Sequence, residues 1–325
     1  MSTRRAVRSS VVAALLLLGV VLQVPSFGAA AREPGPSLTT PRALLEDALH
    51  CPSRITRPPV LLVHGTSVTA SENWSWNYVK ALPHYGFDVC TVDMPDRLLI
   101  DIQTTTEYVV FAIRRMHALS HRPVDVVGIS QGALQPRWAL KFWPDLRTAV
   151  DDYVSMAGTN HGSAFADASC AGGSCIESLW QQRVSGSSFQ RVLNAGDTTP
   201  GRVSYTSVYS LTDEIIQPSS PAAVAAIDGA VNIPVQDICP GRVVGHGASA
   251  ADAAYFAVVL DALTHRGPAQ PSRVDRHSCT QVFMPYVDPV EGASRTAEIY
   301  LIASEVQAQH GKTDAEPALR PYARG

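Results

Sequence analysis

The amino-acid sequence predicts an α/β protein with a mostly parallel central sheet and helices on both faces of that sheet. Short apolar runs alternate along the chain with segments of helical periodicity, which is typical of linked strand–helix–strand units. The runs are almost entirely apolar, as in parallel strands that are buried on both sides. The chain has 325 residues, of which 46% are hydrophobic and 17% are charged, so it can form one large core.

Five short runs are expected to form buried strands, and they span residues 59–63, 87–92, 124–127, 150–157 and 203–210. Two helices are expected to begin at the capping-box spacings Thr104–Glu107 and Ser249–Asp252. In such a box, a hydroxyl and a carboxylate three residues apart bond main-chain N–H groups at a helix start. The stretches 133–142 and 296–307 also have helical periodicity.

Residues 1–31 are predicted to be a signal peptide. Three arginines within the first eight residues precede the apolar run 11–24, and Ala29 and Ala31 then offer a cleavage site. An uncleaved anchor is the alternative, but the run is shorter than the roughly 18 to 20 residues that span a bilayer. The protein is therefore expected to be secreted, and the export route stays open.

Three regions are expected after the signal peptide. Residues 32–42 are rich in Pro, Gly and Thr and predict an extended leader, residues 43–306 form the main domain, and residues 307–325 form a polar, loose C-terminal tail. The net charge is −3 and no run of Lys or Arg follows the first ten residues, which excludes a nucleic-acid partner. We expect a monomer.

The six cysteines are an even number in a chain that is expected to be exported, so they predict disulfides. Cys170 and Cys175 enclose a glycine-rich turn that brings the two sulfurs together, and we expect them to pair. None of the cysteines has the spacing of a metal or redox site, and no metal is expected. Spacing alone leaves the pairing of the other four open: Cys51, Cys90, Cys239 and Cys279.

Residues 128–132 read Gly-Ile-Ser-Gln-Gly and match the pattern G-x-S-x-G. In this pattern the serine lies on a strained turn between a strand and a helix, and the glycines allow close approach of neighbouring backbone. A serine that only caps a helix is the alternative, but the strand 124–127 leads directly into the turn. Ser130 is therefore the predicted nucleophile.

A nucleophilic serine needs a base and an orienting acid, which in this arrangement follow it in the order acid, then histidine. Of the histidines after a suitable acid, His246 alone lies between two glycines at the start of an expected helix. Asp213 follows a predicted strand and so reaches the carboxyl edge of the sheet, where catalytic loops gather. Asp213 and His246 are the predicted acid and base, and Glu214 is the neighbour that could be mistaken for the acid.

Two main-chain amides are expected to stabilise the oxyanion that forms during acyl transfer. They belong to the residue after the nucleophile and to the loop after an early strand, which are Gln131 and Thr66. The Thr66 hydroxyl is a further donor in this expectation.

From about residue 43 to 286 the sequence resembles the Candida antarctica lipase B-like family of α/β-hydrolase lipases. The resemblance rests on ordered blocks: Leu61–Thr66, Thr106–Tyr108, Ser130–Gly132, Trp180–Gln182, Tyr209–Ile215 and Met284–Tyr286. It implies the α/β-hydrolase fold, a triacylglycerol lipase or esterase activity, no cofactor and no metal, and the same triad. It also implies the disulfides Cys51–Cys90 and Cys239–Cys279, whereas Cys170–Cys175 has no counterpart.

Three departures from the family concern its substrate pocket. Ile129 stands where the family has a tryptophan that limits the size of a secondary alcohol, so bulkier alcohols are expected to fit. Thr159 stands where the family has an aspartate, and that polar contact does not carry over. Only residues 267–281 fill an interval that holds a helical segment in the family, so a more open pocket is expected unless the helix 296–307 covers it.

Together these residues predict a secreted serine esterase or lipase that hydrolyses triacylglycerols and fatty acyl esters through an acyl-enzyme on Ser130. Transient contact with a lipid interface is expected. A polyester hydrolase or an acyltransferase with the same triad is an alternative, because water or another alcohol can accept the acyl group. A secreted binding protein that has lost catalysis is a second alternative, but such a protein would lack a triad residue, and none is missing.

Overall fold

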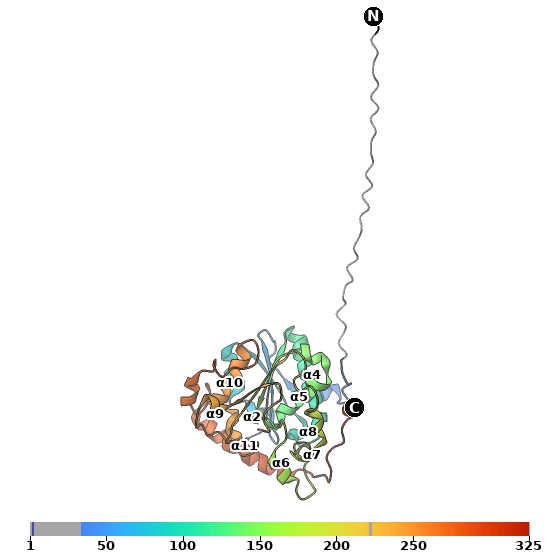
Figure 1. Cartoon of the computed structure of the whole chain (residues 1–325), viewed down its shortest axis with the longest axis vertical. Coiled ribbons are helices and arrows are strands. Elements are labelled where there is room, and N and C mark those ends of the chain that lie inside the picture. Colours follow the sequence, from blue (N-terminus) through green and yellow to red (C-terminus); the bar gives the residue numbers. More distant parts are fainter. Residues whose placement is uncertain (1, 3–33, 221–222, 325) are drawn as a thin grey trace. The chain divides into compact units, whose positions relative to one another are not determined.

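The computed structural model describes residues 2, 34–220 and 223–324 (Figure 1). The predicted signal peptide, residues 1–31, lies outside the described residues apart from Ser2. Within the described part of the chain, none of the helices combines the length and apolar character that a membrane span requires.

A seven-stranded sheet forms the centre of the fold, and its strands lie in the order β1-β3-β2-β4-β5-β6-β7. Strand β1 pairs antiparallel with β3, and the other neighbours all run parallel. The strands are β1 Leu49–His50, β2 Pro59–Val63, β3 Asp88–Val92, β4 Val124–Ile129, β5 Val150–Met156, β6 Ser204–Tyr209 and β7 Val231–Pro234. The mostly parallel sheet predicted from the sequence is confirmed.

Alternate side chains of each strand enter two different cores, because successive residues of a strand point to opposite faces of the sheet. In β2, for example, Val60 and Leu62 belong to one apolar cluster, whereas Leu61 and Val63 belong to the other. All five residues of β2 are buried. The continuous apolar runs of the sequence therefore reflect a sheet that is covered on both sides.

Helices cover both faces (Figure 1). One core contains residues of α2 Ala70–Trp74, α3 Tyr78–Ala81, α9 Val235–Ile238 and α10 Ala253–Thr264. The other contains residues of α1 Arg42–Asp47, α4 Ile102–Ser120, α5 Leu134–Phe142 and α8 Ser188–Leu193. Near the carboxyl ends of the strands lie α6 Ala164–Ser169, α7 Glu177–Gln181 and the long α11 Pro289–Gln309.

The cap of α4 lies three residues before the predicted one. Asp101 caps this helix, since its carboxylate accepts from the amide of Gln103 at 3.0 Å. Glu107 does not close a capping box at Thr104. Its carboxylate instead accepts hydrogen bonds from the main-chain amides of Thr39 and Thr40 and from the Thr39 hydroxyl. These bonds fix the leader to the domain.

The predicted start of α10 was also misplaced. Asp252 is itself the cap, because its Oδ1 accepts from the amides of Ala254 and Tyr255 at 2.8 and 3.1 Å. Ser249 lies in a preceding 3₁₀ turn, and its hydroxyl donates to the carbonyl oxygen of His246 at 2.6 Å. Asp252 thus begins the helix that Ser249 was expected to begin.

Residues 307–324 do not form the loose tail that was expected from their polarity. Thr313 exchanges main-chain hydrogen bonds with Cys175, at 2.8 and 2.9 Å. Glu316 accepts from the amides of Ser188 and Phe189 at the start of α8. Main-chain and side-chain groups of this segment bond the domain, and residues 310–324, which follow α11, form a strap across the domain surface.

Three disulfides link the pairs that were expected. Two of them join segments about 40 residues apart, since their sequence separations are 39 and 40, and the third closes a local loop of separation 5. Cross-links of this kind stabilise a fold mainly by restricting the unfolded chain. The pairs are Cys51–Cys90, Cys170–Cys175 and Cys239–Cys279.

Candidate active site

Ser130 lies on a sharp turn directly after β4, where a 3₁₀ turn leads into α5. Its φ of 56° is in the left-handed region, which is strained for any residue except glycine. Two close backbone approaches make the turn possible. A Cβ atom at Gly128 would lie 2.3 Å from the carbonyl oxygen of Gly132, and one at Gly132 would lie 2.2 Å from the carbonyl oxygen of His64. Any larger residue at Gly128 or Gly132 would therefore clash with neighbouring backbone.

The parallel sheet brings the three predicted triad residues to one edge. Ser130 follows β4 and Asp213 lies four residues beyond the end of β6. His246 comes after β7 and α9, in the loop that leads to α10. Since β4, β6 and β7 run parallel, their carboxyl ends open toward the same side of the sheet.

The three side chains form a continuous hydrogen-bonded chain. The Nε2 atom of His246 lies 3.0 Å from Ser130 Oγ, and its Nδ1 atom lies 2.9 Å from Asp213 Oδ2. The other oxygen of Asp213 accepts from the amides of Ile215 and Ile216 at 2.9 and 2.8 Å. With Nδ1–H donating to Asp213, Nε2 is free to accept the proton of the serine hydroxyl.

Burial and charge act in opposite directions on this pair. Burial by itself would raise the pKa of Asp213, but the charge of His246, its hydrogen bond and the two main-chain amides hold that pKa below its ordinary value. Burial would lower the pKa of His246, but the charge and hydrogen bond of Asp213, with a smaller contribution from Glu214, raise it above its ordinary value. Asp213 therefore stays ionised and makes His246 a stronger base.

The two expected oxyanion residues belong to the segments next to Ser130. Thr66 is in the loop after β2, and Gln131 is in the first turn of a helical segment, where main-chain N–H groups lack partners inside the helix. The Thr66 hydroxyl donates to Gln131 Oε1 at 2.7 Å, and the same oxygen accepts from Gln182 Nε2 at 2.8 Å. These side-chain bonds link the loop after β2 to the turn that carries Ser130.

A cavity of about 390 Å³ opens beside Ser130 and His246. This volume lies within the range of small-molecule sites. Its walls are mostly apolar, and they come from loops, from α6 and α7, and from α11. The apolar side chains are Val68, Ile129, Phe165, Ala166, Leu179, Ile215, Ala250, Ile299 and Ala303.

Each pocket expectation has a place in this cavity. Ile129 and Thr159 both line it, at 4% and 2% exposure. The Thr159 hydroxyl donates to Gln182 Oε1 at 3.1 Å. The helix expected at 296–307 is the second half of α11, and its residues Ile299 and Gln307 do line the cavity. The short interval 267–281 therefore does not leave this side of the pocket open.

Comparison with known proteins places this geometry in a family. The family model for Lipase (class 2) matches residues 57–224, which is more than half of the chain. The chain is 30% identical to lipase B of Pseudozyma antarctica over 299 residues, which cover 89% of this chain and 86% of the relative. The chain belongs to the class 2 lipase family. It is therefore a carboxylic ester hydrolase, and the resemblance stated from the sequence is confirmed.

A solved structure agrees with this assignment. The crystal structure of Aspergillus fumigatus lipase B superimposes with a TM-score of 0.83 at 32% sequence identity, over 90% of this chain and 74% of that chain. The predicted α/β-hydrolase fold is thereby confirmed.

The sequence did not reveal the polar residues that surround the triad. Gln182 bonds Gln131 and Thr159, and Tyr300 of α11 bonds Glu214 and the amide of Gly247. These residues are 50 or more positions away from the groups that they contact, except for Thr159. The helical periodicity of residues 296–307 pointed to α11 as a pocket wall, but it could not say which side chain reaches the histidine loop.

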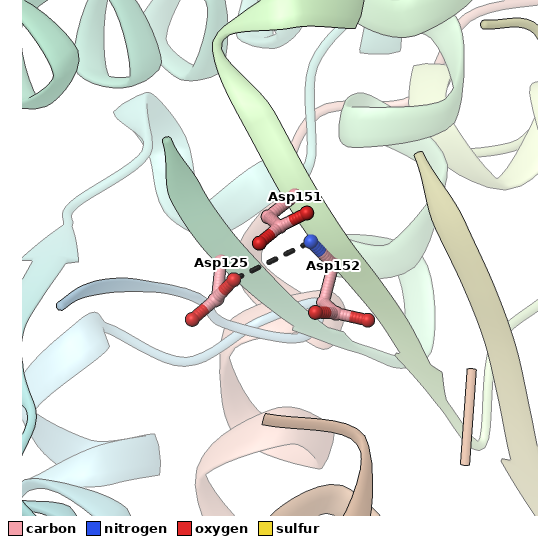
Figure 2. A group of neighbouring side chains, drawn as sticks. All are labelled: Asp125, Asp151 and Asp152. Atoms are coloured by element: carbon pink, nitrogen blue, oxygen red, sulfur yellow. Dashed lines mark hydrogen bonds between the residues drawn. The ribbon is translucent and has the colours of Figure 1, made fainter. Parts of the chain in front are cut away.

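Three aspartates form a separate cluster at the opposite edge of the sheet. Asp125 is the second residue of β4, and Asp151 and Asp152 are the second and third residues of β5 (Figure 2). Each offers a carboxylate oxygen within 4.8 Å of the others, a spacing that would suit a metal ion. Burial and mutual repulsion raise the pKa of Asp125 to about 7 and that of Asp152 to about 8. Ser130 lies five positions after Asp125, or about 17 Å along the strand, so this cluster takes no part in the chemistry of the serine.

Proposed function

We propose that the chain is an exported lipase or esterase that hydrolyses fatty acyl esters through an acyl-enzyme on Ser130. The observation that carries this proposal is the unbroken chain of hydrogen bonds from Ser130 through His246 to Asp213, at 3.0 and 2.9 Å. Ser130 and His246 line a mostly apolar cavity that can hold the substrate.

The acylation half-reaction uses His246 first as a base and then as an acid. As Ser130 Oγ attacks the ester carbonyl carbon, Nε2 of His246 takes the hydroxyl proton, and the carbonyl oxygen becomes an oxyanion. The amides of Thr66 and Gln131 stabilise that oxyanion. The intermediate collapses, the bond to the alkoxy oxygen breaks, and His246 gives its proton to the departing alcohol. The acyl group is then bonded to Ser130.

Deacylation repeats these steps with water. His246 takes a proton from water, the resulting hydroxide attacks the acyl carbon, and the proton returns to Ser130 as the carboxylic acid leaves. Throughout, Asp213 remains a carboxylate that stabilises the imidazolium. This role agrees with the lowered pKa of Asp213 and the raised pKa of His246.

The substrate is proposed to be an ester with a hydrocarbon acyl chain, such as a triacylglycerol. Leu179, Ile299 and Ala303 belong to the apolar walls that would contact that chain. Burial of one CH₂ group is worth about 0.8 kcal/mol, or about fourfold in kcat/KM for each carbon that the cavity holds. Phe165 and Tyr300 line the cavity and are both 39% exposed, which supports brief contact of the rim with a lipid surface.

Export is proposed from the N-terminal segment and the cysteines. The arginines and the apolar run of residues 1–31 have the composition of a signal peptide. The three disulfides form and persist in an oxidising compartment. Mass spectrometry of the secreted protein should find a mature N-terminus near Arg32, and full-length protein retained in the cell would contradict this proposal.

We also propose that the secreted chain acts as a monomer, which size-exclusion chromatography with light scattering would test.

A chain-length series of p-nitrophenyl esters, together with emulsified triglycerides, tests the proposed function. The wild type should hydrolyse them with kcat/KM rising over the first carbons and then levelling when the cavity is full. Ser130→Ala should lose this activity by several orders of magnitude, with only the roughly 10³ to 10⁴-fold effect of oxyanion and binding groups over water remaining. Retained activity in Ser130→Ala would contradict the proposed mechanism, and preference for an alcohol over water would identify an acyltransferase.

A further inference from the structure

Tyr300, in the second half of α11, is bonded to the loop that carries His246. Its hydroxyl donates to Glu214 Oε1 at 2.5 Å and accepts from the amide of Gly247 at 2.7 Å. The other oxygen of Glu214 accepts from the amide of His246 at 3.0 Å. Two successive main-chain N–H groups, at and just after the histidine, are thus held by one tyrosine–glutamate pair.

The two glycines beside His246 have a physical reason in this pair. A Cβ atom at Gly247 would lie 2.6 Å from Tyr300 Cε2, and one at Gly245 would lie 2.9 Å from Glu214 Oε2. Neither glycine is among the residues with positive φ, so the requirement is for space and not for an unusual conformation. The loop is built to let Tyr300 and Glu214 approach the histidine backbone closely.

Asp213 and Glu214 act on different parts of the same histidine. Asp213 bonds the imidazole, whereas Glu214 bonds the backbone, and the charge of Glu214 also contributes to the raised pKa of His246. Burial and the nearby Glu214 carboxylate raise the pKa of Tyr300, so its hydroxyl keeps its proton and donates it to that carboxylate. This bond fixes the carboxylate in the position from which it holds the histidine amide.

The helix that carries Tyr300 contacts both catalytic loops. Gln307, two turns further along α11, donates to Ser67 Oγ at 3.0 Å, and Ser67 follows the expected oxyanion residue Thr66. Of the described residues in α11, Gly292 alone is buried. Few apolar contacts therefore fix this helix, and its hydrogen bonds to the two loops carry more of its attachment than in a core helix.

We propose that Tyr300 is a positioning residue for the catalytic histidine, acting through Glu214 and through the amide of Gly247. This inference rests on the proposed role of His246 as the base. It makes α11 both a wall of the pocket and a support of the triad. Loss of the Tyr300 hydroxyl should lower the rate of the chemical step and leave the ring, and with it the pocket wall, in place.

The test compares Tyr300→Phe with the matched control Tyr322→Phe. Tyr322 also has a hydrogen-bonded hydroxyl, which accepts from Trp138 Nε1 at 3.1 Å, but its contacts lie in the core on the other face of the sheet. An active-site phosphonate titrates the competent enzyme, so that kcat refers to folded protein only. With p-nitrophenyl butyrate, Tyr300→Phe should lower kcat about tenfold with little change in KM, since misplacement of a reacting group by 1 Å can cost about 10²-fold. Tyr322→Phe should have the wild-type kcat.

Three further variants test the bonds through which Tyr300 acts. Glu214→Gln should move the acidic limb of the kcat/KM profile to lower pH, because it removes a negative charge that raises the pKa of His246. In the double variant with Tyr300→Phe, the losses in kcat should be smaller than the product of the single losses, since both residues belong to one chain of bonds. Gly247→Ala, which forces the ring aside, should give the same loss in kcat if Tyr300→Phe does not fold.

Wild-type kcat and a wild-type pH profile in Tyr300→Phe and Gly247→Ala would overturn the inference, as would fully multiplicative losses in the double variant. If Ser130→Ala keeps its activity, the proposed function itself fails. An inactive Ser130→Ala beside a fully active Tyr300→Phe would remove only the role of Tyr300.

Discussion

Replacement of Asp213 by asparagine tests how the acid controls the base. Asp213 is 1% exposed, and its two oxygens have separate partners. Oδ1 accepts hydrogen bonds from the amides of Ile215 and Ile216, whereas Oδ2 accepts one from His246 Nδ1. The single oxygen of asparagine can keep the two amide bonds, which leaves its NH₂ group facing Nδ1. The imidazole must then carry its proton on Nε2, and it cannot accept the proton of Ser130.

The loss should be large because the wrong tautomer stops the reaction at its first step. For such a change in a serine–histidine–aspartate triad, kcat falls by roughly 10⁴-fold, which corresponds to about 5.4 kcal/mol. The pH dependence should change as well. Asp213 raises the pKa of His246 against the effect of burial, so its removal should move the acidic limb of kcat/KM to lower pH.

The assay is steady-state hydrolysis of p-nitrophenyl butyrate from pH 4 to pH 9 by the wild type, Asp213→Asn and Glu214→Gln. Glu214 bonds the histidine backbone and not the imidazole, so Glu214→Gln should lose far less activity than Asp213→Asn. A greater loss in Glu214→Gln than in Asp213→Asn would refute the assignment of the acid.

Three other changes test the pocket, the turn and the acidic cluster. Ile129→Trp should sharpen discrimination between enantiomers of a 1-phenylethyl ester by about 10-fold or more, because it fills space beside Ser130; an unchanged ratio of kcat/KM values would show that Ile129 does not limit the alcohol. Gly132→Ala should abolish folding, measured by circular dichroism, whereas Gly172→Ala, whose Cβ meets nothing within 4 Å, should fold normally. The raised pKa of Asp152 means that its own contribution to stability is greatest at low pH and is lost as pH rises toward about 8, so the unfolding midpoint should fall less over this range in Asp152→Asn. Each unit of pKa shift is worth about 1.4 kcal/mol of stability. An equal fall of the unfolding midpoint in the wild type and in Asp152→Asn would contradict this prediction.

The sequence predicted the elements whose signals are local. Apolar runs such as Pro59–Val63 identify buried strands, because a strand that is covered on both faces has no polar side. The G-x-S-x-G spacing predicted the turn at Ser130. The steric limit at Gly128 is local, since it involves Gly132, whereas the limit at Gly132 involves His64, which follows β2. Asp213 and His246 could also be predicted, because the parallel sheet brings the loops that follow β6 and β7 to the edge where Ser130 lies.

Other features depend on contacts between distant segments and could not be read from local patterns. Glu107 has the spacing of a capping box, but its carboxylate bonds Thr39 and Thr40 of the leader instead. The C-terminal strap is polar, yet Glu316 finds unpaired amides at the start of α8, 128 residues away. Tyr300 bonds Glu214 across 86 positions. Such pairs emerge only after the helices have packed against the sheet.

Covalent labelling of Ser130 tests the central claim most directly. Diethyl p-nitrophenyl phosphate reacts with a serine that an adjacent base has activated, and it leaves a stable phosphoryl ester that mass spectrometry of peptides can locate. The wild type should gain one phosphoryl group, on Ser130, in step with loss of esterase activity, and His246→Ala should react far more slowly. Complete loss of activity with the label on another residue, or full labelling in Ser130→Ala, would contradict the assignment of the nucleophile.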